Sequence, residues 1–325
     1  MSDCPLFVPF PAQAGLQERV IDLCEQRSPH IEYYFHVPGD ESSPPLFIKY
    51  GSSNLRAEAR TQEYLHILAK SDPRAPRVPL VFDSFSDSIG NGYIVMQYVP
   101  PPATTLGSWV DGGCSVDERQ RRSDFAISKV ADIISWLHAC PLPPDAGIGP
   151  VGGGVSQHRF FADSEAPMEF ASADALQVYV NRALERSPRK PPRRVTGLSK
   201  YPLQFCHSDI SPDNFLIDPV TLEVWLVDAQ HISILPEPFA SFALYTTATP
   251  FIAEVAARMN LEPWPHLNDL ARAAQLIQMS ADKSLGLDSY GRKKPVVKMP
   301  HFDSEASWRA WVASKQIPLP AQTVS

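Results

Sequence analysis

Runs of hydrophobic residues along the first hundred positions predict a strand-rich region that also contains two helices. Four short runs are rich in aromatic and branched residues and are bounded by turn-forming residues, which is typical of strands. Two other segments repeat hydrophobic residues at helical spacing. The predicted strands are 31–37, 46–50, 78–85 and 93–99, and the predicted helices are 11–26 and 55–70.

The pattern changes after three consecutive prolines at 100–102, which interrupt regular structure because proline fixes φ and lacks an N–H donor. Most of the following chain has helical spacing, and three short hydrophobic runs interrupt it. The predicted helices are 117–138, 173–186 and most of the chain from 239 onward, and the predicted strands are 203–206, 214–217 and 224–227. We therefore predict an α+β fold with two lobes, a small sheet lobe at 1–100 and a larger, mainly helical lobe at 101–325.

Composition and charge narrow the classes of partner. The chain is 44% hydrophobic and 20% charged, which is typical of a soluble globular protein. Its formal charge of -7 argues against binding nucleic acid through phosphate contacts. The basic segment 186–194 is a local exception, and a solvated loop is a simpler interpretation of it than a polyanion contact.

The cysteines and the hydrophobic runs bear on location. The chain has five cysteines and no CxxC pair, so neither a zinc site nor a disulfide framework is indicated. The first residues lack the pattern of a signal peptide, and no apolar run approaches the roughly 20 residues that span a bilayer. We expect a cytoplasmic protein with reduced thiols and no membrane partner.

Three polar residues near the centre of the chain have the spacing that phosphoryl transfer requires. Asp209 and Asn214 are five residues apart in a loop between two predicted strands, and Asp228 ends the next strand. Such a site needs one carboxylate to orient the attacking hydroxyl and further oxygen ligands for magnesium. The alternative is that the side chains of this loop only cap a turn.

A lysine and a glutamate in the first region form a second candidate pair. Lys49 lies in a predicted strand, and Glu58 follows in the first turns of the next helix. This strand lysine and helix glutamate are the pair that kinases use at the nucleotide phosphates. Glu63 is a competing partner at a different helical angle, and Lys49 could instead be a lysine that extends from a sheet edge into solvent.

The chain resembles the aminoglycoside phosphotransferase and choline kinase-like family, and most closely its fungal branch. The last of the matching stretches, His207-Ser-Asp-Ile-Ser-Pro-Asp-Asn214 with the two residues before it, is the most specific. The matching stretches are 47–51, 55–59, 78–81, 93–99, 148–153 and 205–214.

This resemblance implies a protein-kinase-like fold and a role for each matching residue. Asp209 would be the catalytic base, and Asn214 and Asp228 would bind Mg²⁺. Lys49, paired with Glu58, would contact the phosphates of ATP or GTP. Backbone groups of Gln97 to Val99 would contact the nucleotide base, and His207 would brace the catalytic loop.

The expected function is therefore Mg²⁺-dependent transfer of a nucleotide γ-phosphate to a hydroxyl of a small molecule. The acidic net charge would suit a cationic acceptor such as an aminoalcohol or an aminoglycoside. The chain lacks an evident glycine-rich phosphate loop, and Ala229-Gln230 follows Asp228 where relatives often carry Phe-Gly or Trp-Glu. These departures leave two alternatives: a pseudokinase that only binds a nucleotide or ligand, and a kinase-like scaffold that acts on a natural product by other chemistry.

Overall fold

The computed structural model describes residues 15–26, 33–39, 44–51, 55–246, 249–295 and 304–314. Residues 1–292 form one compact unit and residues 293–325 form a second, to which the helix α9 (Glu305–Ser314) belongs. The lobe boundary predicted near residue 100 falls inside the first unit and stays a prediction. Residues 11–14 of the first predicted helix and residues 31 and 32 of the first predicted strand lie outside the described part of the chain.

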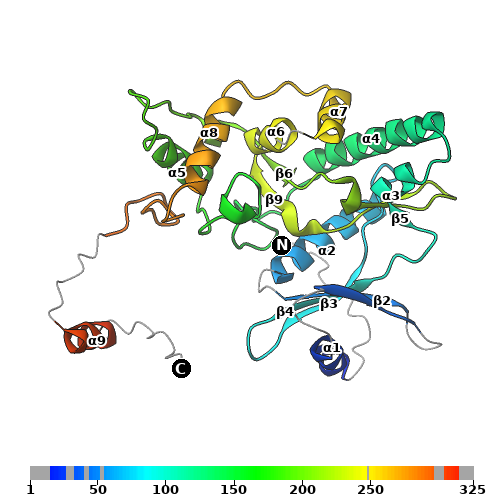
Figure 1. Ribbon diagram of the computed structural model, residues 1–325, viewed down its shortest axis with the longest axis horizontal. Helices are drawn as coiled ribbons and strands as arrows, with labels where there is room; N and C mark the ends of the chain where they lie inside the picture. Colours follow the sequence, from blue (N-terminus) through cyan, green and yellow to red (C-terminus); the bar gives the residue numbers. More distant parts are fainter. Residues whose placement is uncertain are drawn as a thin grey trace. The chain divides into compact units, whose positions relative to one another are not determined.

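The first part of the larger unit is a four-stranded antiparallel sheet with a helix on each face (Figure 1). The strand order is β1-β2-β4-β3. Helix α1 packs on one face through Val20 and Cys24, and α2 packs on the other through Leu55 and Ala59. The elements are α1 (Leu16–Glu25), β1 (Tyr34–Val37), β2 (Leu46–Gly51), α2 (Leu55–Ser71), β3 (Val81–Ser86) and β4 (Gly92–Gln97).

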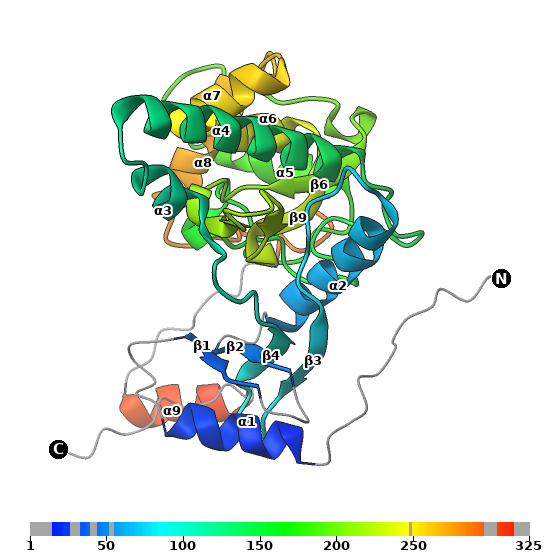
Figure 2. The same cartoon turned by 90° about the vertical axis from the view of Figure 1, so that its right-hand side faces the viewer.

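The remainder of this unit is mainly helical, so the predicted α+β fold class is confirmed. Helices α4, α6 and α7 gather around a two-stranded ladder, β6 with β9 (Figure 2). The helices are α3 (Leu106–Asp111), α4 (Val116–Ala139), α5 (Ala173–Leu184), α6 (Pro238–Tyr245), α7 (Pro250–Met259) and α8 (Leu267–Gln278). The strands are β5 (Thr104–Thr105), β6 (Leu203–His207), β7 (Phe215–Ile217), β8 (Val224–Leu226) and β9 (Ile232–Pro236). Four short 3₁₀ segments complete this part: η1 (Ala162–Ser164), η2 (Leu198–Lys200), η3 (Pro212–Asn214) and η4 (Ala229–His231).

Hydroxyl side chains determine where three of these helices begin. The side-chain oxygens of Thr105, Ser115 and Ser172 each accept a hydrogen bond of 3.1 Å from the backbone N–H three residues further on. Such a cap satisfies a donor that the first helical turn would leave unpaired. The sequence pattern anticipated the starts of α4 and α5 to within a residue, whereas the short helix α3 was not predicted.

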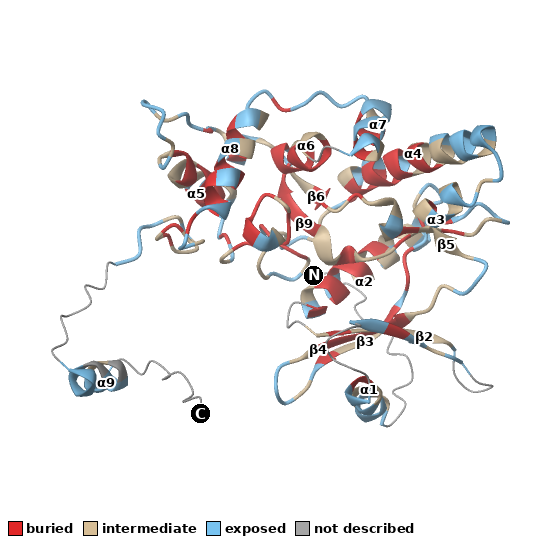
Figure 3. Cartoon of the chain, viewed as in Figure 1, coloured by how far each residue is buried: buried red, intermediate tan, exposed pale blue. Residues whose placement is uncertain are grey.

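Strand β9 is the main element that the hydrophobic pattern missed. All five of its residues are buried, so the alternation that identifies a half-exposed strand does not occur. It pairs antiparallel with β6, which leads into the loop that contains Asp209 and Asn214, and residues in β6, β9 and α4 are among the most buried of this unit (Figure 3). Ser233, its one polar member, accepts a hydrogen bond from the Gln157 N–H at 3.0 Å. β9 therefore anchors the site from inside the core.

No helix in the described part of the chain is long and apolar enough to cross a membrane. Among the described residues, Cys114, Cys140 and Cys206 are cysteines outside any disulfide. The basic segment 186–194 is largely exposed, and two of its arginines, Arg193 and Arg194, form ion pairs with nearby carboxylates.

Two buried histidines make the fold sensitive to acid. Burial lowers the pKa of His158 to about 3 and that of His207 to about 4. In the unfolded chain each would titrate near its ordinary value of about 6.5. The unfolded state therefore binds more protons below pH 6.5, and the stability that these residues contribute at neutral pH is lost as the pH falls toward 4.

Each of the two histidines should lower the free energy of unfolding by about 2 kcal/mol between pH 7 and pH 5. The buried Glu58, whose pKa burial raises to about 7, should offset about half of that sum, so we expect a net loss of about 2 kcal/mol. Urea titrations at half-unit pH intervals would measure this change. A free energy of unfolding that stays constant from pH 7 to pH 5 would contradict it.

Candidate functional site

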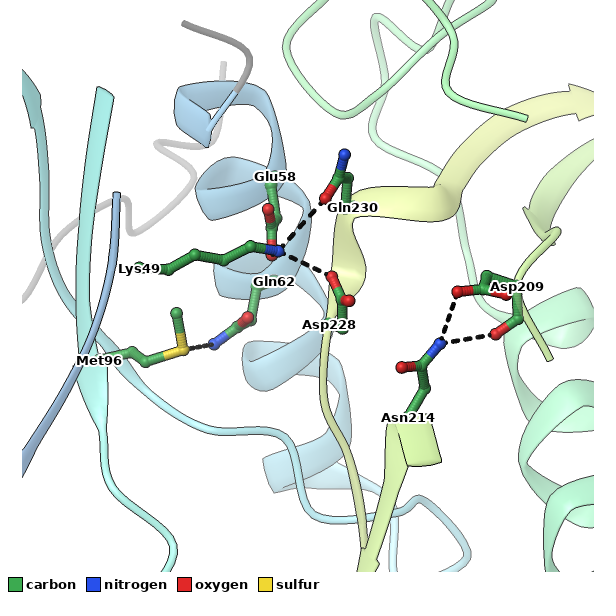
Figure 4. Close-up of polar contacts among 8 residues, drawn as sticks. All are labelled: Lys49, Glu58, Gln62, Met96, Asp209, Asn214, Asp228 and Gln230. Atoms are coloured by element: carbon green, nitrogen blue, oxygen red, sulfur yellow. Dashed lines mark hydrogen bonds and ion pairs between the residues drawn. The ribbon is translucent and has the colours of Figure 1, made fainter. Parts of the chain in front are cut away.

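Lys49 lies at the centre of a cluster formed by three distant segments (Figure 4). Its Nζ lies 2.9 Å from Glu58 Oε1, 2.9 Å from Asp228 Oδ1 and 3.3 Å from Gln230 Oε1. Lys49 and Asp228 are 179 positions apart in sequence. The contact therefore joins β2 in the sheet to the segment that follows β8.

The strand period and the helix period explain this pairing. Ile48 and Tyr50 point into the core under α1, so Lys49 between them points to the opposite face, toward α2. Glu58 lies in the first turn of α2. Glu63, the competing partner, comes five residues later and is therefore turned about 140° around the helix axis. The structure brings Lys49 together with Glu58.

Burial and proximity set the charges of this cluster. Burial raises the pKa of Glu58 to about 7, although the adjacent Lys49 ammonium opposes the shift. Burial also acts to lower the pKa of Lys49, but Glu58 and Asp228 outweigh it, so the lysine stays protonated. Burial acts to raise the pKa of Asp228, but the Lys49 ammonium outweighs it and holds that pKa below its ordinary value. Lys49 is thus the counterion of two carboxyl groups.

Asp209 and Asn214 meet in the loop between β6 and β7. Asn214 Nδ2 donates to the Asp209 backbone carbonyl at 2.8 Å and to Asp209 Oδ2 at 3.0 Å (Figure 4). The Ser211 N–H donates to the same carbonyl at 2.9 Å. These bonds hold both side chains in place. A side chain that only caps a turn bonds to the backbone, whereas the Asn214 amide also bonds to the Asp209 carboxylate.

The loop is tied to the strands on either side of it. The Val227 N–H donates to the Asn214 carbonyl at 3.1 Å, which sets Asp228 beside the loop. Asp228 itself has φ 59°, a left-handed conformation that aspartate adopts more readily than most residues. The Ser208 N–H donates to the His231 carbonyl at 3.0 Å. Asp209, Asn214 and Asp228 therefore belong to one hydrogen-bonded frame.

His207 lies beneath this frame. Its side chain is buried, and Nδ1 accepts a hydrogen bond of 3.4 Å from the Asp209 N–H. Burial lowers the pKa of His207 to about 4, so the ring is neutral at pH 7. This contact fits the bracing role that the resemblance implies for His207.

Arg159 is a member of the site that the sequence did not reveal. Its guanidinium forms an ion pair with Asp209 Oδ1, and its backbone N–H donates to Ser208 Oγ at 3.2 Å. Arg159 precedes Asp209 by 50 positions and lies in an irregular segment, so neither spacing nor periodicity could have connected the two residues. Gln230, which accepts a hydrogen bond from Lys49, was likewise seen only as a departure from the family pattern.

The backbone groups predicted to contact the nucleotide base lie at and just after the end of β4. The Gln97 N–H already donates to the Leu80 carbonyl at 2.8 Å. Within the described residues the Val99 N–H has no hydrogen-bond partner, so it is available to a ligand. Of the predicted contacts with a nucleotide base, the N–H of Val99 is therefore better placed than that of Gln97.

The glycine-rich segment 147–154 packs against α2 and β9. Gly149 and Ile234 exchange two backbone hydrogen bonds, of 3.0 and 2.7 Å. Arg60 donates to the carbonyls of Val151 and Gly153 at 3.0 and 2.9 Å. A Cβ at Gly152, whose φ is +75°, would lie 2.7 Å from the Arg60 side chain. The glycines permit this close approach, and the segment holds the helix that carries Glu58.

The turn that would cover phosphates lies between β1 and β2. Residues 40–43 of this turn are outside the described part of the chain. The prediction that no glycine-rich loop covers the phosphates is therefore not tested beyond Pro38 and Gly39.

The oxygen atoms beside Asp209 suit a magnesium ion. Asn214 uses its amide nitrogen to bind Asp209, so its Oδ1 is turned away from that residue toward the side where Asp228 lies (Figure 4). Asp228 accepts from Lys49 through Oδ1 and has a second carboxylate oxygen. Amide and carboxylate oxygens are the ligands that Mg²⁺ prefers. No group of three or more His, Cys, Asp or Glu side chains with metal-binding geometry occurs among the described residues.

Comparison with known families agrees with this geometry. The model of the phosphotransferase enzyme family (APH) matches residues 45–227, more than half of the chain. The chain belongs to the phosphotransferase enzyme family. The matched region of this phosphotransferase-family chain contains Lys49, Glu58, Asp209 and Asn214, and it ends one residue before Asp228.

Two solved structures illustrate what the phosphotransferase-family chain is similar to, whereas no curated protein matches it. One is a thermostable mutant of aminoglycoside phosphotransferase APH(4)-Ia in a ternary complex with AMP-PNP and hygromycin B. It is 15% identical, with 82% of this chain and 90% of that chain covered and a TM-score of 0.47. The other is the GDP complex of wild-type aminoglycoside 2'-phosphotransferase-IIIa, which is 14% identical, with 81% and 88% covered and a TM-score of 0.41.

Proposed function

We propose that this protein is a Mg²⁺-dependent kinase that transfers the γ-phosphoryl group of ATP or GTP to a hydroxyl of a small molecule. The observation that carries the proposal is the Lys49 cluster, in which one partly buried ammonium bridges Glu58 and Asp228 at 2.9 Å each. A nucleotide phosphate needs a fixed cation beside the magnesium ligands, and this cluster supplies one.

In this proposal Lys49 binds the nucleotide phosphates and Glu58 holds Lys49 in position. Backbone groups of Gln97 and Val99 contact the purine. Asp209 orients the acceptor hydroxyl and takes its proton. The hydroxyl oxygen bonds to the γ-phosphorus, the bond from that phosphorus to the bridging oxygen breaks, and the nucleoside diphosphate leaves with the electron pair.

Asn214 and Asp228 would hold Mg²⁺, which when bound neutralises charge on the phosphate oxygens. The chemistry of their oxygen atoms supports this assignment, and the hydrogen bonds from Asn214 to Asp209 keep the amide oriented for it. In this proposal the Lys49 ammonium pairs with Asp228 before the nucleotide binds, and a bound phosphate then competes with Asp228 for it.

A small molecule is the better candidate for acceptor than a protein. The whole segment from Asp228 to Phe239 consists of η4, β9 and the start of α6, and β9 is buried within the core. A protein kinase uses the corresponding stretch as an activation loop. We also keep the expectations of a cytoplasmic location and of no nucleic-acid partner, which rest on composition.

Nucleotide binding tests this proposal before any acceptor is known. In the presence of Mg²⁺, ATP or GTP at about 100 times its dissociation constant should stabilise the protein by about 2.7 kcal/mol. Thermal unfolding with ATP, GTP, CTP and no nucleotide, each with and without Mg²⁺, would measure the effect and identify the donor. CTP serves as the matched control because it carries the same phosphates on a pyrimidine.

Two outcomes would go against the proposal. If no nucleotide raises the melting temperature even with Mg²⁺, the protein is not a nucleotide-dependent kinase. If a nucleotide binds but no hydroxyl compound increases its turnover, the nucleotide-binding pseudokinase becomes the better interpretation.

A further inference from the structure

We propose that Arg159 binds an anionic group of the acceptor, a carboxylate or a phosphate, next to the hydroxyl that is phosphorylated. The inference rests on the proposed function, since it assigns the acceptor side of the same site. It makes the acceptor a hydroxy acid or a phosphorylated alcohol, in contrast to the cationic acceptor that the net charge of the chain suggested.

The two oxygens of Asp209 have different partners. Asn214, the candidate metal ligand, donates to Oδ2 at 3.0 Å, whereas the Arg159 guanidinium pairs with Oδ1. Arg159 therefore approaches Asp209 through the oxygen that Asn214 leaves free. An acceptor hydroxyl that binds Asp209 there lies within hydrogen-bond reach of the guanidinium.

The backbone of Arg159 is fixed while its side chain can move. Its N–H donates to Ser208 Oγ, and both of its neighbours, His158 and Phe160, are completely buried. The His158 ring binds the Phe239 carbonyl and the Phe160 N–H, each at 3.1 Å. The Arg159 side chain is 36% exposed and the Asp209 side chain 26%. The guanidinium can thus turn from Asp209 to a ligand without moving the chain.

Among the described residues, Asp209 is the only carboxylate that forms an ion pair with Arg159. The nearby His207 is neutral at pH 7 because burial lowers its pKa to about 4. The charge beside an acceptor hydroxyl at Asp209 is therefore that of a guanidinium, which repels an ammonium and attracts an anion. A planar guanidinium also matches the two oxygens of a carboxylate or phosphate.

An anionic acceptor would also free the catalytic carboxylate. When the acceptor anion replaces Asp209 as the partner of Arg159, Oδ1 becomes available to the acceptor hydroxyl. A neutral or cationic alcohol has nothing to offer the guanidinium, so it must compete with the ion pair. The site then selects an anionic acceptor because the Arg159–Asp209 ion pair is exchanged for an ion pair between Arg159 and the acceptor. The net charge of the chain does not predict this selection, because recognition depends on the charges close to the ligand.

Matched acceptors that differ in one charged substituent test this proposal in the full-length protein with the magnesium nucleotide that binds. The first set is glycerate, glycerol and 3-amino-1,2-propanediol, and the second is glucuronate, glucose and glucosamine. Glycerol 3-phosphate extends the first set to a phosphate. Nucleoside diphosphate release and the ligand-induced shift in melting temperature with AMP-PNP would be measured for each compound.

We expect at least one anionic member to have a kcat/KM about 10-fold or more above those of its neutral and cationic counterparts. Arg159→Ala should lower kcat/KM for that compound by roughly 100-fold, mainly through KM, and should not lower that of the neutral member by a comparable factor, so that the preference for the anion is lost. Arg159→Lys should restore part of the loss. Arg77→Ala is the matched control, because Arg77 is also exposed and ion-paired, to Glu223, but lies outside the site.

Three results would overturn the proposal while nucleotide binding persists. The cationic member of a set could be preferred, Arg159→Ala could lower all members of a set by the same factor, or every anionic compound could fail both to react and to shift the melting temperature. AMP-PNP binding by Arg159→Ala shows that the variant is folded. Failure of the proposed function is a separate result, in which the wild-type protein binds no nucleotide at all.

Discussion

Asp209→Asn is expected to lower kcat by about 10³-fold with the acceptor that the protein uses, because an amide cannot take the hydroxyl proton. Nucleotide affinity should stay within about twofold, since our proposal assigns Asp209 to the acceptor side and the phosphate contacts to Lys49. An asparagine at position 209 keeps one side-chain oxygen, so it can accept from either the Asn214 amide, now at Oδ2, or the Arg159 guanidinium, now at Oδ1. Single-turnover kinetics with separate titration of the nucleotide would distinguish the two effects.

Asp213→Asn is the matched control in the same loop. Asp213 is exposed, and within the described residues its carboxylate makes no hydrogen bond. We expect activity close to that of the wild type. If Asp209→Asn retained wild-type turnover, Asp209 would not be the base, and the turn-capping interpretation of the loop would gain support.

Lys49→Met is expected to reduce both nucleotide binding and stability. The substitution removes the counterion of Glu58, a residue that is 4% exposed and already has one carboxylate oxygen without a partner among the described residues. A buried carboxyl group that loses its ion-pair partner must be protonated or remain an uncompensated charge. We expect the free energy of unfolding to fall by about 3 kcal/mol, and the magnesium nucleotide to give no thermal shift.

A double variant separates the two consequences. In Lys49→Met with Glu58→Gln the buried charge is gone, so most of the lost stability should return, while nucleotide binding should remain absent. Lys70→Met is a matched control, because Lys70 is an exposed lysine at the end of α2. Equal melting temperatures for Lys49→Met and the wild type would show that the ion pair does not stabilise the fold. Retained nucleotide binding would remove Lys49 from the site.

These two experiments address the two halves of the site independently. Asp209 and Asn214 come from one loop and are held by local hydrogen bonds. Lys49 lies near the start of the matched region and Asp228 directly after its end, and the two meet because the sheet and η4 both pack against α2. Loss of turnover without loss of nucleotide binding, and the reverse, would therefore support the division of roles that we propose.

Local pattern determines much of this molecule. The four strands of the first sheet, helix α2 and helix α4 follow from hydrophobic period and turn residues, and their predicted bounds differ from those observed by a few residues. The β6–β7 loop could also be anticipated, since Asp209 and Asn214 are only five residues apart. In each case the decisive interactions join residues that are close in sequence or repeat with a regular period.

The predicted pairing of Lys49 with Glu58 had the same origin. Nine residues separate them, and the strand and helix periods decide which faces they occupy. Helical angle favoured Glu58 over Glu63 before any packing was known.

The tertiary structure alone decided the rest. Fully buried β9 has no alternating pattern, and its pairing with β6 depends on a partner 25 or more positions away. The ion pair of Arg159 with Asp209 joins an irregular segment to the catalytic loop across 50 positions. Such contacts arise from packing and charge between segments that no local period relates. The sequence by itself therefore determines the phosphotransferase framework and its acidic residues, whereas the pairing of Arg159 with Asp209 is revealed only by the folded chain.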